Sequence, residues 1–338
     1  MSAPTIIIAA DEMRDRFTSI LLPLGFTESR ATALAEIFTV NSVDGIYTHG
    51  VNRFPRFVQY VKDGYVVPQA VPTLHHKFGA IEQWVGHRGP GALNALHATD
   101  AAMRLAHEYG IGCVALANTN HWIRGGTYGW HAAKAGYVFI GMTNTIGVMP
   151  AWGALDSRLG NNPFVIALPY QDEAIVLDMA MSQYSFGAME LAVFNDQPLA
   201  VYGGYDPEGQ LTLDPASVLT SRRALPIGYW KGAGLSLLLD ILSTILSAGL
   251  AGHEITKAGI ETDISQVFIA IELGRLGNHS VIPKTVQQII DDYHQSIKMN
   301  PSTKITYPGE RVLNNRKHNT EHGIPVLKKV WEEILSLG

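Results

Sequence analysis

Four short runs of apolar and β-forming residues in the middle of the chain constrain the fold more than any other feature of this sequence. Turn-forming residues separate the runs, which is typical of strands joined by tight connections. Segments with the apolar spacing of helices lie on both sides of them. The sequence therefore predicts a mixed α/β protein whose central strands include residues 112–117, 138–143, 164–168 and 174–177.

Helical spacing is found at both ends of the chain. Residues 11–64 have the pattern of three consecutive helices, and two more helices are expected at 284–295 and 326–337. Helices that flank a mixed centre bury their apolar faces best against one another. We therefore expect one helical domain formed by residues 1–70 and 284–338, beside a mixed α/β core of residues 71–283.

The longest apolar stretch runs from Gly232 to Gly252. Asp240 lies at its centre, and several serine and threonine residues interrupt it. A membrane span would place the Asp240 carboxylate in the middle of the bilayer, which is costly. We therefore predict a helix buried in the protein and no membrane contact.

Charge and cysteine content limit the partners and the compartment. The chain has 25 basic and 30 acidic residues, a formal net charge of -5, and no long basic face. Binding to a nucleic-acid backbone is therefore not expected. The single cysteine, Cys113, fits a reducing compartment. Residues 1–10 lack the basic segment of a secretory signal, so we expect a cytoplasmic protein.

The motifs of several common enzyme classes are missing. The nearest approach to the dinucleotide motif Gly-x-Gly-x-x-Gly is at residues 232–237, and Leu237 stands where its third glycine belongs. His107 and His253 each precede a glutamate as in a zinc-protease helix, but neither has the second histidine, and we expect no metal. Gly-x-Ser-x-Gly and the phosphate loop are also absent. A standard dinucleotide fold and the common hydrolases are therefore disfavoured.

The segment 48–57 is the strongest candidate for catalysis. If a helix follows the Thr-His-Gly turn, His49 lies at its start, and Arg53 and Arg56 follow on nearly the same face. Reduction of a keto acid needs an acid for the carbonyl oxygen and a guanidinium for the carboxylate. The alternative is an ordinary helix N-terminus capped by Thr48, with solvated arginines and a histidine without function.

His121 is a second candidate. It follows a short apolar strand and precedes Gly125, Gly126 and Gly129. Glycines after a strand allow the backbone to approach a ligand closely, and strand ends often carry function. A structural histidine in a turn is the alternative.

A third candidate is the strand that leads through Val176 to Asp178 and on to Ser182. With Ser182 as N-cap of a following helix, the helix start would hold a pyrophosphate, and Asp178 would lie near a ribose hydroxyl. A strand-turn-helix corner without a ligand is the alternative.

These segments resemble, in their order along nearly the whole chain, the second malate/lactate dehydrogenase family, whose members bind NAD without a Rossmann fold. The order of the motifs is more specific than any one of them. The matching residues are Thr48-His49-Gly50, Asn120-His121, Asn162-Pro163, Leu177-Asp178-Met179, Lys231-Gly232 and Pro308-Gly309-Glu310.

The resemblance implies an atypical NAD-binding α/β fold, which explains the missing glycine motif. It also implies a homodimer with active sites near the subunit interface. His49 would donate the proton, and His121 would line the same site. From the residues of segment 48–57, we expect Arg53 or Arg56 to hold the substrate carboxylate. The cofactor would lie along Val176, Leu177, Asp178, Met179, Ala180, Met181, Ser182, Trp230, Lys231, Gly309, Glu310 and Arg311.

Three stretches, 47–57, 121–126 and 225–232, most resemble the branch of the family that reduces diketogulonate, a sugar-derived keto acid. Two lysines of other branches have no counterpart. None occurs between residues 181 and 190, and Thr145-Ile146 stands where the ureidoglycolate branch has a substrate lysine. These departures argue against ureidoglycolate and simple malate as substrates.

We therefore expect an NAD(P)H-dependent reductase of a sugar-derived 2-keto acid. A dehydrogenase of a small 2-hydroxy acid and a cyclic imine reductase are alternatives within the family. A ligand-binding relative without activity, or a lyase that uses both histidines, are alternatives outside it. NADH is expected over NADPH, because the segment around Asp178 has no basic residue for a 2′-phosphate. Arg222 and Arg223 are the residues that would reverse this preference.

Overall fold

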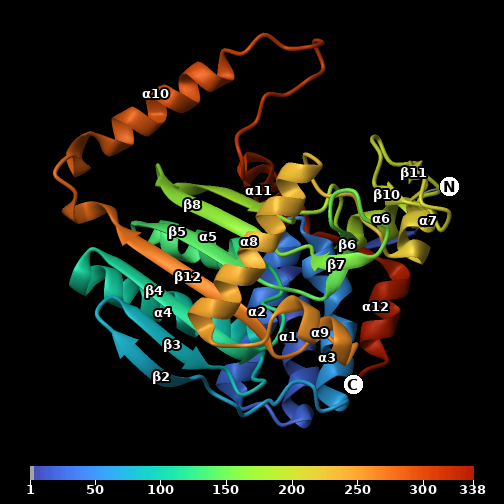
Figure 1. The fold of residues 1–338 in the computed structure, drawn as a ribbon, viewed down its shortest axis with the longest axis horizontal. Helices are drawn as coiled ribbons and strands as arrows, with labels where there is room; N and C mark the ends of the chain where they lie inside the picture. Colours follow the sequence, from blue (N-terminus) through green and yellow to red (C-terminus); the bar gives the residue numbers. More distant parts are fainter. Residues whose placement is uncertain (1–3) are drawn as a thin grey trace.

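The computed structural model describes residues 4–338, and a seven-stranded sheet lies at its centre (Figure 1). The strand order is β2-β3-β4-β12-β5-β8-β9, and among the neighbours only β3 and β4 run parallel. The mostly antiparallel sheet confirms a mixed α/β fold unlike a parallel dinucleotide sheet. All four predicted runs lie in it. Its strands are β2 (Thr73–Phe78), β3 (Ile81–Val85), β4 (Ile111–Thr119), β5 (Tyr137–Thr143), β8 (Phe164–Tyr170), β9 (Glu173–Met179) and β12 (Ile264–Glu272).

Helices cover both faces of the sheet. On one face, α4 (Gly91–Tyr109) packs against β4 and β12, and α5 (Gly125–Lys134) packs against β5, β8 and β9. The buried face of α4 is rich in alanine. At Gly112 of β4 a Cβ atom would lie only 2.2 Å from the Ala102 carbonyl oxygen. Small residues thus let α4 approach the sheet closely, and this packing fixes the loop that follows β4.

The two ends of the chain pack together, as expected. β1 (Thr5–Ile8) pairs antiparallel with β13 (Ile324–Leu327). The helices α1 (Ala10–Leu21), α2 (Glu28–Val43), α3 (Phe54–Lys62) and α12 (Lys328–Leu335) share one hydrophobic core with these strands. The prediction of a helix over 326–337 was wrong at its start, because Val326 and Leu327 pair with β1 before the helix begins. The division into two domains stays a prediction.

Shorter elements complete the fold. The helix α10 (Ile282–His294), predicted from the sequence at 284–295, extends away from the main body (Figure 1) and contacts β8. The remaining elements are β6 (Gly147–Pro150), β7 (Ser157–Gly160), β10 (Gly204–Tyr205), β11 (Leu211–Thr212), α6 (Phe186–Phe194), α7 (Pro215–Ser221), α8 (Trp230–Ser247), α9 (Gly252–Ala258) and α11 (Glu310–His322).

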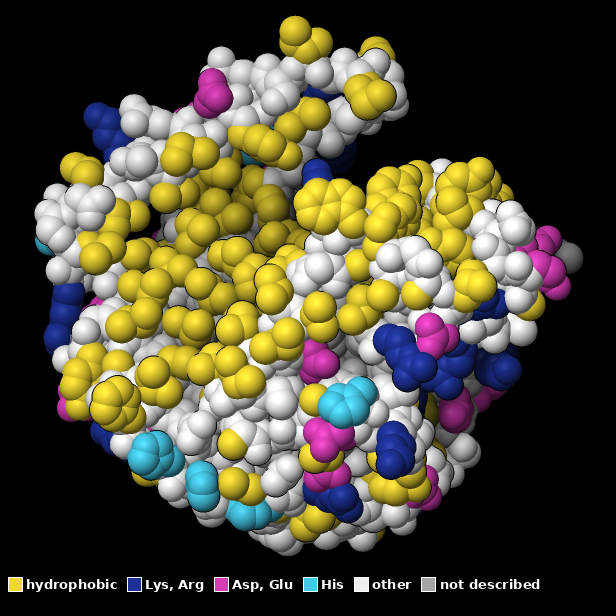
Figure 2. Space-filling model, viewed as in Figure 1, with side chains coloured by type: hydrophobic (Ala, Val, Ile, Leu, Met, Phe, Trp, Pro, Cys, Tyr) yellow, Lys and Arg dark blue, Asp and Glu magenta, His cyan; other side chains and the backbone are white. Residues whose placement is uncertain are grey.

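The helix α8 is not buried as predicted. Its small residues, including Ser236 and Ser243, face the sheet, whereas Leu238 is 56% and Ile245 is 62% exposed. In Figure 2 hydrophobic side chains form a broad band over this region and toward α10. Asp240 accepts hydrogen bonds from Gly252 N at 2.9 Å and Asn144 Nδ2 at 3.0 Å. The mid-helix carboxylate therefore fixes the start of α9.

Within 4–338 no single helix has the length and apolar content needed to cross a bilayer. The helices α8 and α9 satisfy both requirements only when they are taken together, and the chain bends by 91° between them.

Candidate active site

A pocket of about 1080 Å³ brings together the three segments that the sequence singled out. Its wall is formed by the turns before α3, the loop between β4 and α5, the end of β9, the start of α6, and the segment that leads into α11. His49, Arg53, His121 and Asp178 all line it.

The end of α2 holds the segment that carries His49. Asn41 Nδ2 donates to the His49 carbonyl oxygen at 2.9 Å, and Val51 N donates to Ser42 Oγ at 2.8 Å. At Gly50 a Cβ atom would lie 2.3 Å from Ser42 Oγ, so only glycine permits this approach. The expected helix after Gly50 therefore starts late: 3-10 turns span Tyr47–His49 and Val51–Arg53, and α3 begins at Phe54.

The two histidine rings lie side by side in the pocket. Their centroids are 6.1 Å apart, and the ring planes are inclined by 18°. His49 Nδ1 lies 3.0 Å from Thr48 Oγ1, a group that both donates and accepts. His121 Nδ1 accepts a hydrogen bond from Ile123 N at 3.0 Å. Because a backbone N–H only donates, Nδ1 of His121 carries no proton, and the neutral ring has its proton on Nε2.

The pocket lowers the pKa of both histidines. Burial, with repulsion from Arg53 and Arg124, lowers the pKa of His49 from 6.5 to about 4. Burial also lowers the pKa of His121 well below its usual value, and Arg53, His49 and Arg56 add to this effect. Both rings are therefore neutral at neutral pH in the ligand-free protein.

Two guanidinium groups face the pocket without a carboxylate partner. Among residues 4–338, no carboxylate lies within ion-pair distance of Arg53 or Arg56, and only Tyr60 OH, 3.2 Å from Arg56, forms a hydrogen bond with either side chain. Burial lowers the pKa of Arg53 and repulsion from Arg56 adds to this, while Glu261, Tyr60 and Glu190 oppose it. An arginine remains charged under these conditions, so the pair is available to an anionic ligand.

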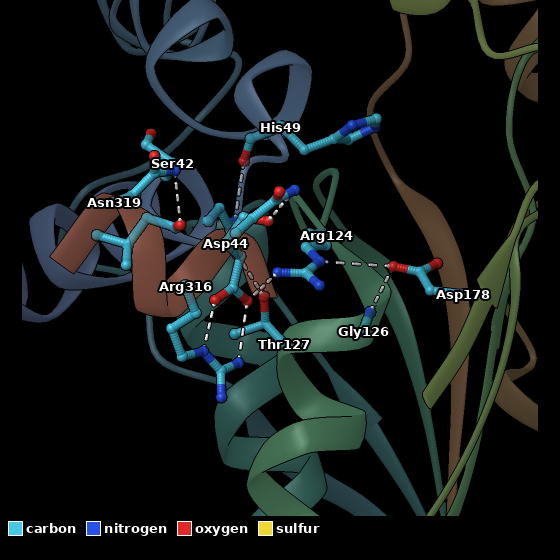
Figure 3. Close-up of polar contacts among 12 residues, drawn as sticks. Ser42, Asp44, His49, Arg124, Gly126, Thr127, Asp178, Arg316 and Asn319 are labelled. Carbon is cyan, nitrogen blue, oxygen red and sulfur yellow. Dashed lines mark hydrogen bonds and ion pairs between the residues drawn. The ribbon is translucent and has the colours of Figure 1, made fainter. Parts of the chain in front are cut away.

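A buried carboxylate that sequence reasoning missed holds a third arginine in the pocket wall. Asp44, 1% exposed at the end of α2, accepts hydrogen bonds from Arg124 Nη1 at 2.6 Å and from Arg316 Nε at 2.7 Å (Figure 3). Arg316 also donates to Glu173 at 3.1 Å. Asp44 is followed by a glycine, which makes it look like an ordinary helix end. The network links α2, α5 and α11 behind the pocket.

Several predicted cofactor residues line the pocket: three from β9, one directly after it, one directly before α11 and one in the first turn of α11. Asp178 Oδ2 accepts a hydrogen bond from Gly126 N at 2.8 Å and lies 3.9 Å from Arg124 Nε (Figure 3). Burial raises the pKa of Asp178, and Arg124 and the Gly126 N–H oppose this effect. The six lining residues are Val176, Leu177, Asp178, Ala180, Gly309 and Arg311.

Other predicted cofactor residues lie outside the pocket wall. Ser182 was predicted to cap the next helix, which is wrong: its Oγ donates to the Tyr184 carbonyl oxygen, and Ser185 Oγ accepts from Ala188 N to cap α6. The turn 182–185 delays the helix because Ser182 pairs with Pro226. The residues outside the wall are Met179, Met181, Ser182, Trp230, Lys231 and Glu310; Met181 is buried and Trp230 and Lys231 are exposed at the start of α8.

The residues of the pocket fit a dinucleotide. Trp130 Nε1 is buried in the wall and has no hydrogen-bond partner in the described chain. Gly309 has φ +96°, and a Cβ atom there would lie 3.1 Å from Val176 N, so the backbone forms a narrow cradle. Asp178 and Arg311 add an acceptor and a cation. Such a set matches the hydroxyls and phosphates of a nucleotide.

Comparison with known proteins gives full-length matches. The family model described as malate/L-lactate dehydrogenase matches residues 8–335. The 2,3-diketo-L-gulonate reductase of Pasteurella multocida (strain Pm70) is 43% identical over 331 residues, which covers 98% of this chain and 99% of that protein. The enzyme of the same name from Citrobacter koseri is 41% identical with the same coverage.

Solved structures agree with these matches. The malate dehydrogenase of Pyrococcus horikoshii OT3 superposes with a TM-score of 0.90 at 25% identity, over 100% of this chain and 96% of that one. The sulfolactate dehydrogenase of Methanocaldococcus jannaschii has a TM-score of 0.90 at 25% identity, over 98% and 96%. The resemblance seen in the sequence is thereby confirmed: this chain is an oxidoreductase that belongs to the malate/L-lactate dehydrogenase family.

Proposed function

We propose that this protein is an NADH-dependent reductase of a sugar-derived 2-keto acid, of the type of 2,3-diketo-L-gulonate. The observation that carries the proposal is the convergence of His49, His121 and the unpaired Arg53 on one pocket with room for a dinucleotide and a small acid. The names of the 41–43% identical relatives support the choice of substrate.

The substrate carboxylate binds to Arg53, with Arg56 beside it. A guanidinium matches a carboxylate with two parallel hydrogen bonds and so orients the adjacent keto group. That orientation turns the carbonyl oxygen toward the histidine pair. When bound, the nicotinamide supplies the hydride to the carbonyl carbon.

The two histidines have different roles. The Nδ1 atom of His121 is occupied by the Ile123 N–H, so a second proton on that ring would lose this hydrogen bond. His121 therefore stays neutral and donates through Nε2–H. His49 faces the Thr48 hydroxyl, which can accept from a protonated ring as well as donate to a neutral one. His49 is therefore the acid that protonates the carbonyl oxygen.

The charge of the substrate prepares this acid. Arg53 is one of the groups that keep the pKa of His49 low. A carboxylate on Arg53 offsets that repulsion and raises the pKa of His49 toward neutrality. The acid is thus protonated when a keto acid is in place.

On the cofactor side, Asp178 accepts hydrogen bonds from the ribose hydroxyls, and Arg311 and the Gly309 backbone hold the phosphates. Trp230 and Lys231, which lie outside the wall of one chain, stay predictions for the pyrophosphate. NADH is preferred because a carboxylate at the ribose repels a 2′-phosphate. Arg223 donates to the Pro207 carbonyl oxygen, whereas Arg222 lines the pocket.

Steady-state kinetics with both cofactors tests this preference. We expect kcat/KM to be higher with NADH than with NADPH. A value for NADPH equal to or above that for NADH would refute the assignment, and loss of the NADPH activity in Arg222→Ala would identify the arginine responsible.

The assembly we propose is a cytoplasmic homodimer. The exposed apolar face of α8 supports self-association, because a monomer rarely leaves such a surface in water. A reducing compartment agrees with the single cysteine, Cys113, which has no second cysteine in the chain to pair with.

A panel of keto acids tests the activity. Purified protein with NADH should reduce 2,3-diketo-L-gulonate faster than pyruvate or oxaloacetate, measured as loss of NADH absorbance. Quenching of tryptophan fluorescence by NADH gives cofactor binding separately. Binding of NADH without reduction of any 2-keto acid would refute the proposed function.

A further inference from the structure

Two glutamates lie in the same pocket as the unpaired arginine pair. Glu190 comes from α6, and Glu261 comes from the segment between α9 and β12. Neither has a part in the reduction described above. In residues 4–338 neither carboxylate forms an ion pair within 4.0 Å, so both remain available to a ligand.

The fold positions both carboxylates toward the substrate end of the pocket. At Gly187, one turn before Glu190 on α6, a Cβ atom would lie 2.8 Å from the Thr48 side chain, so α6 packs directly on the segment that carries His49. Glu261 Oε2 accepts a hydrogen bond from Ile146 N at 3.4 Å. Both glutamates attract the guanidinium groups of Arg53 and Arg56.

The charges at this end of the pocket decide which acid fits. Two arginines and two glutamates balance one another. A substrate with one carboxylate, together with a protonated His49, restores that balance. A second carboxylate on the substrate adds a negative charge beside two glutamates, where like charges in a partly buried site repel. Hydroxyl groups, in contrast, donate hydrogen bonds to carboxylate oxygens.

We propose that Glu190 and Glu261 are specificity-determining residues, which accept hydrogen bonds from the hydroxyls of a polyhydroxy keto acid and reject dicarboxylic keto acids. The proposal rests on the proposed function, since it assigns the substrate contacts beyond the reacting carbon. It predicts that this pocket selects substrates by the charge of the part that lies beside the two glutamates, as well as by the keto acid group.

The test compares Glu190→Gln and Glu261→Gln with wild type on three substrates: 2,3-diketo-L-gulonate, pyruvate and oxaloacetate. Glutamine keeps the shape of the side chain and removes its charge. In each variant kcat/KM for oxaloacetate should rise about tenfold, and that for 2,3-diketo-L-gulonate should fall about tenfold through KM, each about 1.4 kcal/mol. Pyruvate has neither a second carboxylate nor a hydroxyl group, so kcat/KM for pyruvate should change less than about threefold.

A matched control is Glu208→Gln, which removes a glutamate from an exposed loop outside the pocket and should leave all three values unchanged. Inhibition constants for two acids, malonate and gluconate, give a second measurement. Each acid is tested separately as a competitive inhibitor of the keto acid substrate. The glutamine variants should bind malonate more tightly and gluconate less tightly than the wild-type protein does. These acids report charge selection without any hydride transfer.

Equal changes for all three substrates, or an oxaloacetate value that does not rise, would overturn the proposal, because a structural role would alter every substrate alike. Failure of the proposed function is a different result. In that case wild-type protein would reduce none of the three acids, and the specificity proposal would fall with it.

Discussion

A histidine with a strongly lowered pKa is a useful acid only when its ligand restores the proton. His49 meets this condition because Arg53, which we propose binds the substrate carboxylate, is also one of the groups that lower the pKa of His49. His121 does not meet it, because the Ile123 N–H occupies its Nδ1. The two histidines thus differ in the partner of Nδ1, and we propose different roles for them in one pocket.

The first prediction concerns His49→Asn. Loss of a positioned acid should lower kcat by roughly 10²- to 10⁴-fold, while the dissociation constant for NADH, measured by fluorescence quenching, stays within about threefold. His76→Asn, on the exposed strand β2, is the control and should keep wild-type turnover. Near-normal turnover of His49→Asn would show that His49 is not the proton donor.

The second prediction concerns proton uptake. Oxamate, a keto acid mimic, should bind to the complex with NADH with uptake of a proton. The sign follows from the pKa of His49, about 4 in the free protein: between that value and the raised value in the complex, the ring is neutral before binding and charged after it. Affinity for oxamate should therefore fall as pH rises.

Calorimetry in two buffers of different ionisation enthalpy measures this uptake. His49→Asn should abolish it, because His121 stays neutral in both states. Binding of oxamate without proton exchange in the wild-type protein would contradict the role of the substrate charge.

At the scale of elements, the last turn of α2 organises the site. Asn41 fixes the His49 backbone, Ser42 fixes the backbone of Val51, and Asp44 holds Arg124 in the pocket wall. The same turn contacts α5 and α11, so segments far apart in the sequence meet at three polar side chains within four residues. Packing of α2 therefore sets the geometry of the catalytic segment.

The third prediction tests this turn through Asp44→Asn. The change leaves two arginines around a buried neutral group, and breaking a buried ion pair from one side costs about 3–5 kcal/mol of unfolding free energy. Asp11→Asn, which breaks an exposed ion pair with Arg14, should cost at most about 1 kcal/mol. Urea unfolding of both variants compares them, and equal losses would contradict the role of Asp44.

Local patterns predicted much of the fold and singled out the candidate site residues that line one pocket, and long-range contacts account for what they missed. The four central strands were evident because each carries its own β-forming residues and turns. The pairing of β1 with β13 joins residues more than 300 positions apart, and no local pattern encodes it. Asp44 was missed for the same reason: its two partners lie on α5 and α11, and its own neighbourhood looks like a helix end.

At the level of the whole molecule, α8 was predicted to be buried, and the structure leaves one of its faces exposed. Its length and apolar content suggested burial, but the sheet takes the face with small residues, and the leucine-rich face is left outward. Periodicity shows that a helix has two faces and does not show what covers each of them. In this chain the outward face of α8 is left exposed, and the apolar band of Figure 2 extends from it toward α10.

The fourth prediction follows from that surface. Light scattering should give a mass of about twice 36.8 kDa for the wild-type protein. The double change Leu238→Glu and Ile245→Glu puts two charges on the exposed face of α8 and should give a monomer. Leu22→Glu, an exposed leucine near α1, is the control and should leave the mass unchanged. A wild-type mass near 36.8 kDa at micromolar concentration would contradict the dimer.

We propose that this pocket reduces a sugar-derived 2-keto acid with NADH and that His49 supplies the proton. The most direct measurement is the initial rate of NADH oxidation with 2,3-diketo-L-gulonate, for wild type and for His49→Asn at the same NADH occupancy. We predict rapid oxidation by the wild-type protein and a rate lower by roughly 10²-fold or more in the variant. A wild-type protein that binds NADH and leaves 2,3-diketo-L-gulonate unreduced, or a variant as fast as wild type, would contradict the account.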